Sequence, residues 1–185
     1  MHNKEIECRF LEIDKEKLIK KLLGLGAKDL GELMLEEIIF YDLEGTWREK
    51  EKRVRLRKSG DKINLSFKHT EEKTIDGTIE IEFEVSDISK AEKFLEQVGL
   101  TAFRRQQKRR HTFELDDVII DIDTWPRIPT YVELEGPSEE QIKKAAKKLD
   151  LDWKDASFEL PGHIIKNKYG IPVHSMKWFT FDRFE

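Results

Sequence analysis

Acidic and basic residues recur in this sequence at a spacing of two, acids with acids and bases with bases. The repeats are Glu5 and Glu7, Glu80 and Glu82, Asp121 and Asp123, Glu133 and Glu135, then Arg53, Arg55 and Arg57, and Lys108 and Arg110. Carboxylate oxygens are the hard ligands that Mg²⁺ and Mn²⁺ prefer, and guanidinium groups bind phosphate through forked donors. Together the two kinds of repeat favour a site for a divalent metal and a polyphosphate.

A spacing of two indicates β-strands, because residues i and i+2 of a strand point to the same face. In the segment 5–10 the charged residues alternate with Ile6, Cys8 and Phe10. Similar alternation predicts strands at 35–41, 53–57, 63–68, 80–85, 106–113, 118–123 and 131–135. Most of these strands therefore have one charged face and one apolar face.

Three helices are predicted where the apolar period lengthens after a strand. The first helix is capped by Asp14 and ends near Gly24. The second is capped within residues 86–89 and ends near Gly99, and the third is capped by Ser138 and runs to Leu149. Short turns at 58–61 and 115–117 indicate hairpins, so the sheet should be largely antiparallel. We expect a single α+β domain over 1–185, in which a closed antiparallel eight-stranded β-barrel carries helices packed outside. The tail at 157–185 reads as irregular but packed.

The charged strand faces have two explanations. In the ordinary one they are solvated faces of a sheet whose apolar faces are covered by the helices. Solvated faces usually mix signs, however, whereas like charges side by side repel and favour a shared ligand of opposite charge. If the helices cover the outside, the charged faces line a wet tunnel. Its acids would be Glu5, Glu7, Glu80, Glu82, Asp121, Asp123, Glu133 and Glu135, and its bases Arg9, Arg53, Arg55, Arg57, Lys68, Lys108 and Arg110.

Composition restricts the classes of protein to which the chain can belong. Its 185 residues carry a net charge of −4, so the whole chain is a poor generic binder of nucleic acid. The single cysteine, Cys8, excludes an internal disulfide framework and a cysteine-rich zinc site. The five histidines show no metal-ligand spacing, and no apolar run approaches the length of a membrane span. We expect a cytoplasmic protein without a membrane partner.

The ordered set of charged pairs resembles the CYTH superfamily, also called triphosphate tunnel metalloenzymes. Glu5-x-Glu7-x-Arg9 is similar to the ExExK signature of that family, with Arg in place of Lys. The likeness continues through Arg55-Leu56-Arg57, Lys68, Glu80-x-Glu82, Lys108-x-Arg110, Asp121-x-Asp123 and Glu133-x-Glu135. The resemblance implies an eight-stranded tunnel in which the seven bases bind a triphosphate and the eight acids are candidate ligands of Mg²⁺ or Mn²⁺.

The resemblance implies an enzyme acting on a triphosphate, because the family holds class IV adenylate cyclases, thiamine triphosphatases and inorganic triphosphatases. We favour hydrolysis of the terminal phosphoryl group of inorganic, nucleoside or thiamine triphosphate, since it demands fewer specialised contacts. The alternative is cyclisation of ATP to cyclic AMP and pyrophosphate, and no adenine-recognition motif separates the two. A third reading is a non-catalytic module that binds polyphosphate or an RNA 5′-triphosphate through 104–110. Against it, Trp and Tyr are not interleaved with this basic run.

Several details stay open in the sequence. The basic run has charges on both faces, so the inward set is either Lys108 with Arg110 or Arg109; we favour the first, because it directs Phe113 outward. Lys166 or Lys168 could reach the substrate from the C-terminal part. The identity and number of the metal ions are open, as is the choice between a monomer and a homodimer.

Overall fold

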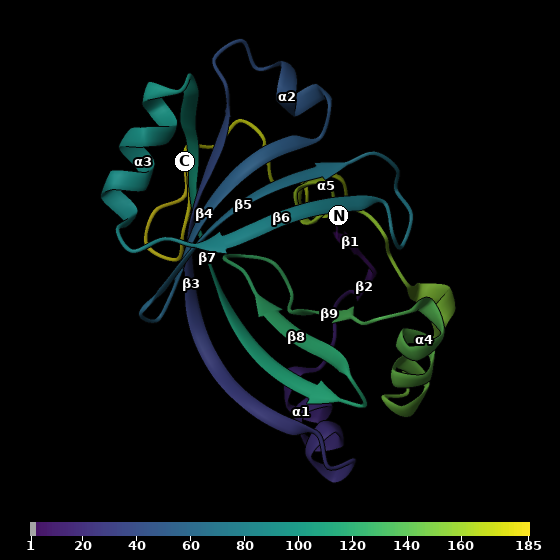
Figure 1. Ribbon diagram of the computed structural model, residues 1–185. Helices are drawn as coiled ribbons and strands as arrows, with labels where there is room; N and C mark the ends of the chain where they lie inside the picture. The colour runs from purple at the N-terminus through teal and green to yellow at the C-terminus, as the bar shows by residue number, and fades with distance from the viewer. Residues whose placement is uncertain (1–2) are drawn as a thin grey trace.

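A computed structural model describes residues 3–185, which form a strongly curled sheet with helices around it (Figure 1). The strands are β1 (Asn3–Glu5), β2 (Glu7–Phe10), β3 (Lys28–Asp42), β4 (Lys52–Ser59), β5 (Lys62–Thr70), β6 (Thr78–Glu84), β7 (Leu100–Leu115), β8 (Val118–Thr124), β9 (Tyr131–Glu135) and β10 (Trp178–Phe179). They are the eight expected strands, with the first divided at Ile6 and β10 added. Their order is β1-β6-β5-β4-β3-β7-β8-β9-β2, and every pair in it is antiparallel.

The N-terminal segment forms both ends of this path. Asn3–Glu5 lies against β6, whereas Glu7–Phe10 lies against β9, and only Ile6 separates β1 from β2. Glu5 and Glu7 consequently lie on two different flanks of the same curled sheet. The predicted α+β class with a largely antiparallel sheet is confirmed, while full closure into an eight-stranded barrel stays a prediction.

The helices begin largely where the capping residues predicted them. They are α1 (Lys15–Gly24), α2 (Thr46–Glu49), α3 (Ile88–Gln97), α4 (Glu139–Lys148) and α5 (Pro161–Tyr169), with a 3₁₀ turn at Trp153–Asp155. The side chains of Asp14, Asp87 and Ser138 each accept a hydrogen bond from a backbone N–H of the first turn. Such caps are worth about 1 kcal/mol each, so these three helix starts are encoded locally.

The expectation of an irregular tail was wrong, because 161–169 form α5. Pro161 stands in its first turn, where the missing N–H costs nothing, and Gly170 ends it with a φ of 69°. Ile165 packs into a cluster with Trp125, Tyr131 and Phe179, and Val173 belongs to the same cluster. This packing fixes the N-terminal end of α5 against one end of the concave face.

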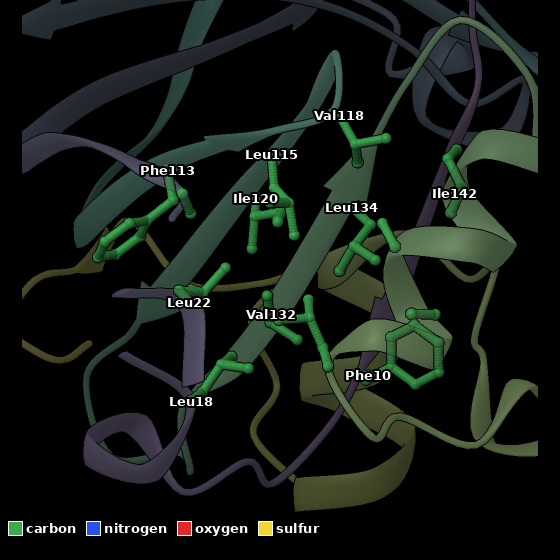
Figure 2. Close-up of a cluster of buried hydrophobic side chains, with 14 of the residues drawn as sticks. Phe10, Leu18, Leu22, Phe113, Leu115, Val118, Ile120, Val132, Leu134 and Ile142 are labelled. Atoms are coloured by element: carbon green, nitrogen blue, oxygen red, sulfur yellow. The ribbon is translucent and has the colours of Figure 1, made fainter. Parts of the chain in front are cut away.

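The main core lies on the convex side of the sheet, between β7–β9 and the helices α1 and α4. Figure 2 shows Leu18 and Leu22 of α1 and Ile142 of α4 around Ile120 and Leu134 of the sheet. Burying each such side chain contributes about 1.5–3 kcal/mol. The apolar strand faces are thereby covered from outside, which leaves the charged faces on the inside.

Helix α3 covers a second part of the convex face. Its Leu95 packs into a cluster with Ile38, Phe40, Val54 and Leu56 of β3 and β4. Within 3–185, no helix is both long enough and apolar enough to cross a membrane.

Candidate active site

The concave face encloses a cavity of about 220 Å³ whose lining is almost entirely ionisable. The lining residues are Glu5, Glu7, Arg9, Arg53, Arg55, Arg57, Lys68, Glu80, Glu82, Lys108, Arg110, Glu133, Glu135 and Pro161. Only Pro161, from the first turn of α5, carries no charge. All seven basic residues proposed from the sequence meet here, together with six of the eight acids. We call this space the charged cavity.

The centre of the wall is a network of ion pairs, which we call the paired centre: Lys108, Arg110, Asp121, Asp123 and Glu133. Arg110 donates from Nε and Nη2 to the two carboxylate oxygens of Asp123, at 2.7 Å each, and also contacts Asp121 and Glu133. Lys108 donates to Asp123 at 2.6 Å. Although burial opposes ionisation, Arg110 and Lys108 hold the pKa of Asp123 below its ordinary value. Asp123 is fully buried beneath these two cations and lines none of the described cavities.

Arg9 joins β2 to β9 at the side of this network. Its Nη2 lies 2.6 Å from Glu7 Oε1 and 2.7 Å from Glu133 Oε2. Burial would raise the pKa of Glu133, but Arg9 and Arg110 hold it well below its ordinary value. The guanidinium that replaces the signature lysine therefore acts as a bridge between two carboxylates.

Lys68 holds a second carboxylate pair, formed by Glu5 and Glu80. Its Nζ lies 2.8 Å from Glu5 Oε1 and 2.7 Å from Glu80 Oε2. Burial and a hydrogen bond that Glu5 donates to Glu80 raise the pKa of Glu5 to about 8. Burial would raise the pKa of Glu80 as well, but accepting that bond, together with the charges of Lys68 and Arg55, lowers it to about 2. Arg55 Nη2 also lies 3.1 Å from Glu80 Oε1. The two carboxyl groups thus share one proton beside two cations, which is the response expected of crowded acids.

Two residues that line the cavity lack partners, and we call them the unpaired rim: Arg53 and Glu135. Within residues 3–185 neither side chain forms an ion pair or hydrogen bond. Glu135 is the register partner of Glu7 across β2 and β9. Burial, and then the charges of Glu133 and Glu7, raise the pKa of Glu135 to about 7. Like charges directly opposite in a sheet are unfavourable without a counterion.

The donor chemistry of these acids fits a hard divalent cation. Glu7, Glu133 and Glu135 present carboxylate oxygens from two adjacent strands, and Glu135 has no cation of its own. In the described part of the chain, no three His, Cys, Asp or Glu side chains are already arranged to hold a metal ion. Two of these carboxylates, Glu7 and Glu133, form ion pairs with Arg9 in the ligand-free protein.

Sequence reasoning missed Glu37, a buried carboxylate on β3. It accepts from Arg57 Nε at 2.6 Å and from the amide of Gln106. Burial would raise its pKa, but Arg57 and Arg55 hold it well below the ordinary value. Its neighbours at a spacing of two, Leu35 and Ile39, are apolar, and the adjacent Glu36 belongs to the opposite face, so no pair of like charges marked Glu37. The available signal was a single acid among the inward-facing residues of the strand predicted at 35–41.

Sequence reasoning also missed Arg104, although it shares a face with Lys108 and Arg110 by the same spacing of two. Arg104 donates to the backbone carbonyl of Val173 at 2.8 Å and to Gln106. It thereby ties the C-terminal part of the chain to β7.

The two ends of the charged cavity differ. At one end a cavity of about 90 Å³ is lined by the α5 residues 161–163 and by Val173 and His174, which we call the closed end. His163 Nε2 lies 2.7 Å from Glu51 there. At the other end, β3 and β8 border a cavity of about 360 Å³.

A family model described as the CYTH domain matches residues 3–156. The chain belongs to the CYTH family. The protein named "Putative adenylate cyclase" of Methanocaldococcus jannaschii is 25% identical over 132 residues, which cover 71% of this chain and 75% of that relative. A Pyrococcus horikoshii structure has a TM-score of 0.73 at 25% identity, covering 84% of this chain and 96% of the other.

Two structures with lower identity share the fold of this CYTH protein. A "putative adenylate cyclase" from Vibrio parahaemolyticus has a TM-score of 0.78 at 13% identity, and covers 90% of this chain and 99% of its own. A "putative adenylyl cyclase" from Hippeastrum, described with a dominant triphosphatase activity, has a TM-score of 0.63 at 15% identity, with coverage of 90% and 96%.

The structure answers the question of register in β7. Lys108 and Arg110 face the charged cavity, whereas Arg109 is exposed beside the ring of Phe181. The basic run 104–110 is therefore divided between two faces rather than presented as one patch. Its outward Arg105 pairs with Glu92.

The two lysines named from the tail lie elsewhere. Neither Lys166 nor Lys168 lines the cavities described above, and Lys168 pairs with Glu12 at 3.2 Å. From α5, Pro161 and His163 reach these cavities instead. The histidine spacing gave no signal of this, because His163 and His174 meet only through the fold, with ring centroids 5.1 Å apart.

Proposed function

We propose that this CYTH protein is a divalent-metal-dependent triphosphatase that hydrolyses the terminal phosphoryl group of a triphosphate held in the charged cavity. The observation that carries the proposal is the meeting of seven cations and six carboxylates around one cavity of about 220 Å³. Cations alone would serve any polyanion, and acids alone would serve a metal. Their presence together favours a metal–polyphosphate complex as the ligand.

Binding requires the cations to exchange partners. Arg9, Lys68 and Arg55 now contact carboxylates. Phosphate oxygens offer these cations a higher charge density, and forked arginine contacts to phosphate are strong. As the triphosphate takes the cations, the carboxylates of Glu5, Glu7, Glu80 and Glu133 become available, together with Glu135.

The chain's own residues then divide the chemistry. When bound, Mg²⁺ or Mn²⁺ supplies charge neutralisation and lowers the pKa of a coordinated water. Arg55, Arg57 and Lys68 hold phosphate oxygens and stabilise the charge that develops on the departing diphosphate as water oxygen bonds to the terminal phosphorus. Glu37 keeps Arg55 and Arg57 oriented from behind.

A second candidate is the adenylate cyclase reaction, in which the ribose 3′-hydroxyl attacks the α-phosphorus and pyrophosphate leaves. The name of the Methanocaldococcus jannaschii relative favours it. The same cations and carboxylates would serve both reactions, so the identity of the products decides between them.

Product analysis tests the proposal. The purified protein is incubated with Mg²⁺ or Mn²⁺ and with ATP, thiamine triphosphate or inorganic triphosphate, and phosphate, pyrophosphate and cyclic AMP are quantified. We expect orthophosphate release that excess chelator abolishes. Arg55→Ala should lose most of the activity, while the outward Arg109→Ala serves as the matched control. Turnover in excess chelator, or none on any triphosphate, would contradict the proposal.

A further inference from the structure

The larger of the two end cavities joins the charged cavity through shared residues. Arg57, Glu82 and Arg110 line both spaces. Its volume of about 360 Å³ lies within the ordinary range of small-molecule pockets. A ligand held by those cations would therefore extend directly into this space.

One part of the wall is apolar at this end, beside polar residues of β4 to β8. In the register of β3 with β7, Leu33 stands opposite Arg110 and Leu35 opposite Lys108. Both leucines therefore point to the concave face that carries the charges. On β8, Ile119 shares the face of Asp121 for the same reason. We call Leu30, Leu33, Leu35 and Ile119 the apolar mouth, since all four line this cavity.

A β-bulge adds Leu30 to this set. The pairing of β3 with β7 shifts between Asp29 and Gly31, so Leu30 is the extra residue. Gly31 takes a φ of 92°, a conformation open to glycine, and its N–H donates to Asp29 Oδ1 at 2.8 Å. Bulges of this kind re-aim a side chain next to functional sites.

The leucines of the mouth are incompletely covered. Leu30 is 45% exposed and Leu33 is 48% exposed, although both border a cavity. Exposed apolar side chains around a concavity indicate an apolar ligand, because covering them removes that surface from water. Inorganic triphosphate has no apolar part to place there.

The closed end offers no comparable space. Its cavity has only about 90 Å³, although Arg53, Arg55 and Lys108 line it as well as the charged cavity. Arg104 on its wall donates to the backbone carbonyl of Val173. The difference in volume favours one direction for a triphosphate with an organic group, with its terminal phosphate toward α5 and its organic group in the apolar mouth.

We propose that the apolar mouth binds the organic group of a triphosphate ester, with a nucleobase as the occupant, and that Leu30 and Leu33 determine selectivity for such esters over inorganic triphosphate. This inference rests on the proposed function. It assigns substrate selectivity to residues outside the charged set.

The test compares substrates on Leu33→Ser and on a matched control, Leu43→Ser. Leu43 is 76% exposed and lines none of the described cavities. kcat/KM is measured for ATP, thiamine triphosphate and inorganic triphosphate, and binding of a non-hydrolysable ATP analogue and of tripolyphosphate is measured by calorimetry. We expect Leu33→Ser to lower kcat/KM for ATP about tenfold, to weaken the analogue equally, and to change inorganic triphosphate less than twofold.

The outcomes separate this inference from the function on which it rests. Equal losses on ATP and inorganic triphosphate, or no loss on ATP, would overturn the selectivity assigned to the mouth while leaving a triphosphatase. Selective loss on thiamine triphosphate alone would replace the nucleobase as the occupant. Absence of turnover on every triphosphate defeats the proposed function, and calorimetry with the ATP analogue still tests the mouth. A wild-type protein that neither binds nor uses nucleotides overturns the inference.

Discussion

The paired centre and the unpaired rim lie on the same wall and differ in how their charges are satisfied. Glu133 and Glu135 are two residues apart on β9 and share a face. Glu133 contacts two arginines and its pKa is held well below the ordinary value, whereas the pKa of Glu135 is raised to about 7. The centre is thus complete without a ligand, and the rim has charges that only a ligand can satisfy. The paired centre therefore contributes to the stability of the ligand-free protein, whereas the rim can meet a ligand without first breaking an ion pair.

Removing Arg110 should produce the largest loss of stability. Arg110→Ala leaves the fully buried Asp123 with Lys108 alone and deprives Asp121 and Glu133 of a cation. Breaking a buried pair from one side typically costs about 3–5 kcal/mol of the free energy of unfolding. Urea unfolding measures this loss of the free energy of unfolding, and Arg109→Ala serves as the matched control. Equal stabilities of the two variants would show that the centre does not hold the fold.

Glu135→Gln should stabilise the ligand-free protein at high pH and weaken metal-dependent turnover. A raised pKa means that the contribution of Glu135 is present below pH 4.5 and is lost as pH rises through about 7. The wild type minus variant difference in the free energy of unfolding should fall by up to about 3 kcal/mol between pH 4.5 and 8. The charges that face Glu135 are those of Glu133, Glu7 and Asp121, which raise its pKa, and that of Lys68, which lowers it.

Melts in chelator across this pH range measure that difference, with Glu96→Gln on the exposed face of α3 as the control. Taking the difference removes contributions common to both proteins, such as that of His174. A difference that stays flat with pH would place Glu135 in bulk solvent, and unchanged metal-dependent turnover would remove it from the metal site.

Arg53→Ala should separate binding from stability. Because Arg53 has no partner within 3–185, we expect the free energy of unfolding to change by less than about 0.5 kcal/mol. KM for the triphosphate should rise about fivefold, less than for Arg55→Ala or Arg57→Ala, since Arg53 lies nearer the start of β4. Steady-state kinetics and urea unfolding of the three variants provide the comparison. A large loss of stability in Arg53→Ala would show that Arg53 is not an unpaired residue.

Arg9→Lys should have only a small effect on stability, although Arg9 is almost fully buried. Both carboxylate contacts of Arg9 come from Nη2, a position that an ammonium group can approach. Lysine loses the bond from Nη1 to the carbonyl of Glu159, but it also removes Nε, which is buried without a partner. We expect a change of about 1 kcal/mol or less in the free energy of unfolding. A loss above 3 kcal/mol would make the guanidinium itself indispensable.

Much of this architecture follows from local rules. Alternation at a spacing of two placed the seven bases on one concave face, and Asp14 and Ser138 set the starts of their helices. The ion pairs between strands could not be predicted from the sequence. Arg110 on β7 contacts Glu133 on β9, with β8 between them, and no spacing in the sequence indicates such a contact. Glu37 was hidden for a related reason, since its same-face neighbours Leu35 and Ile39 are apolar and its partners Arg57 and Gln106 come from other strands.

The double pairing of the N-terminal segment has a consequence for the order of folding. Asn3 pairs with Glu80, and Glu7 pairs with Glu135, so the first strand to be synthesised waits for partners far along the chain. Contacts between residues distant in sequence form late and slowly, because the entropy of loop closure precedes their gain. Hairpins such as β4–β5 pair strands that are adjacent in sequence, so their loops close at a small entropic cost. We therefore expect the charged cavity to be completed only when the N-terminal segment docks between β6 and β9 after these strands have formed.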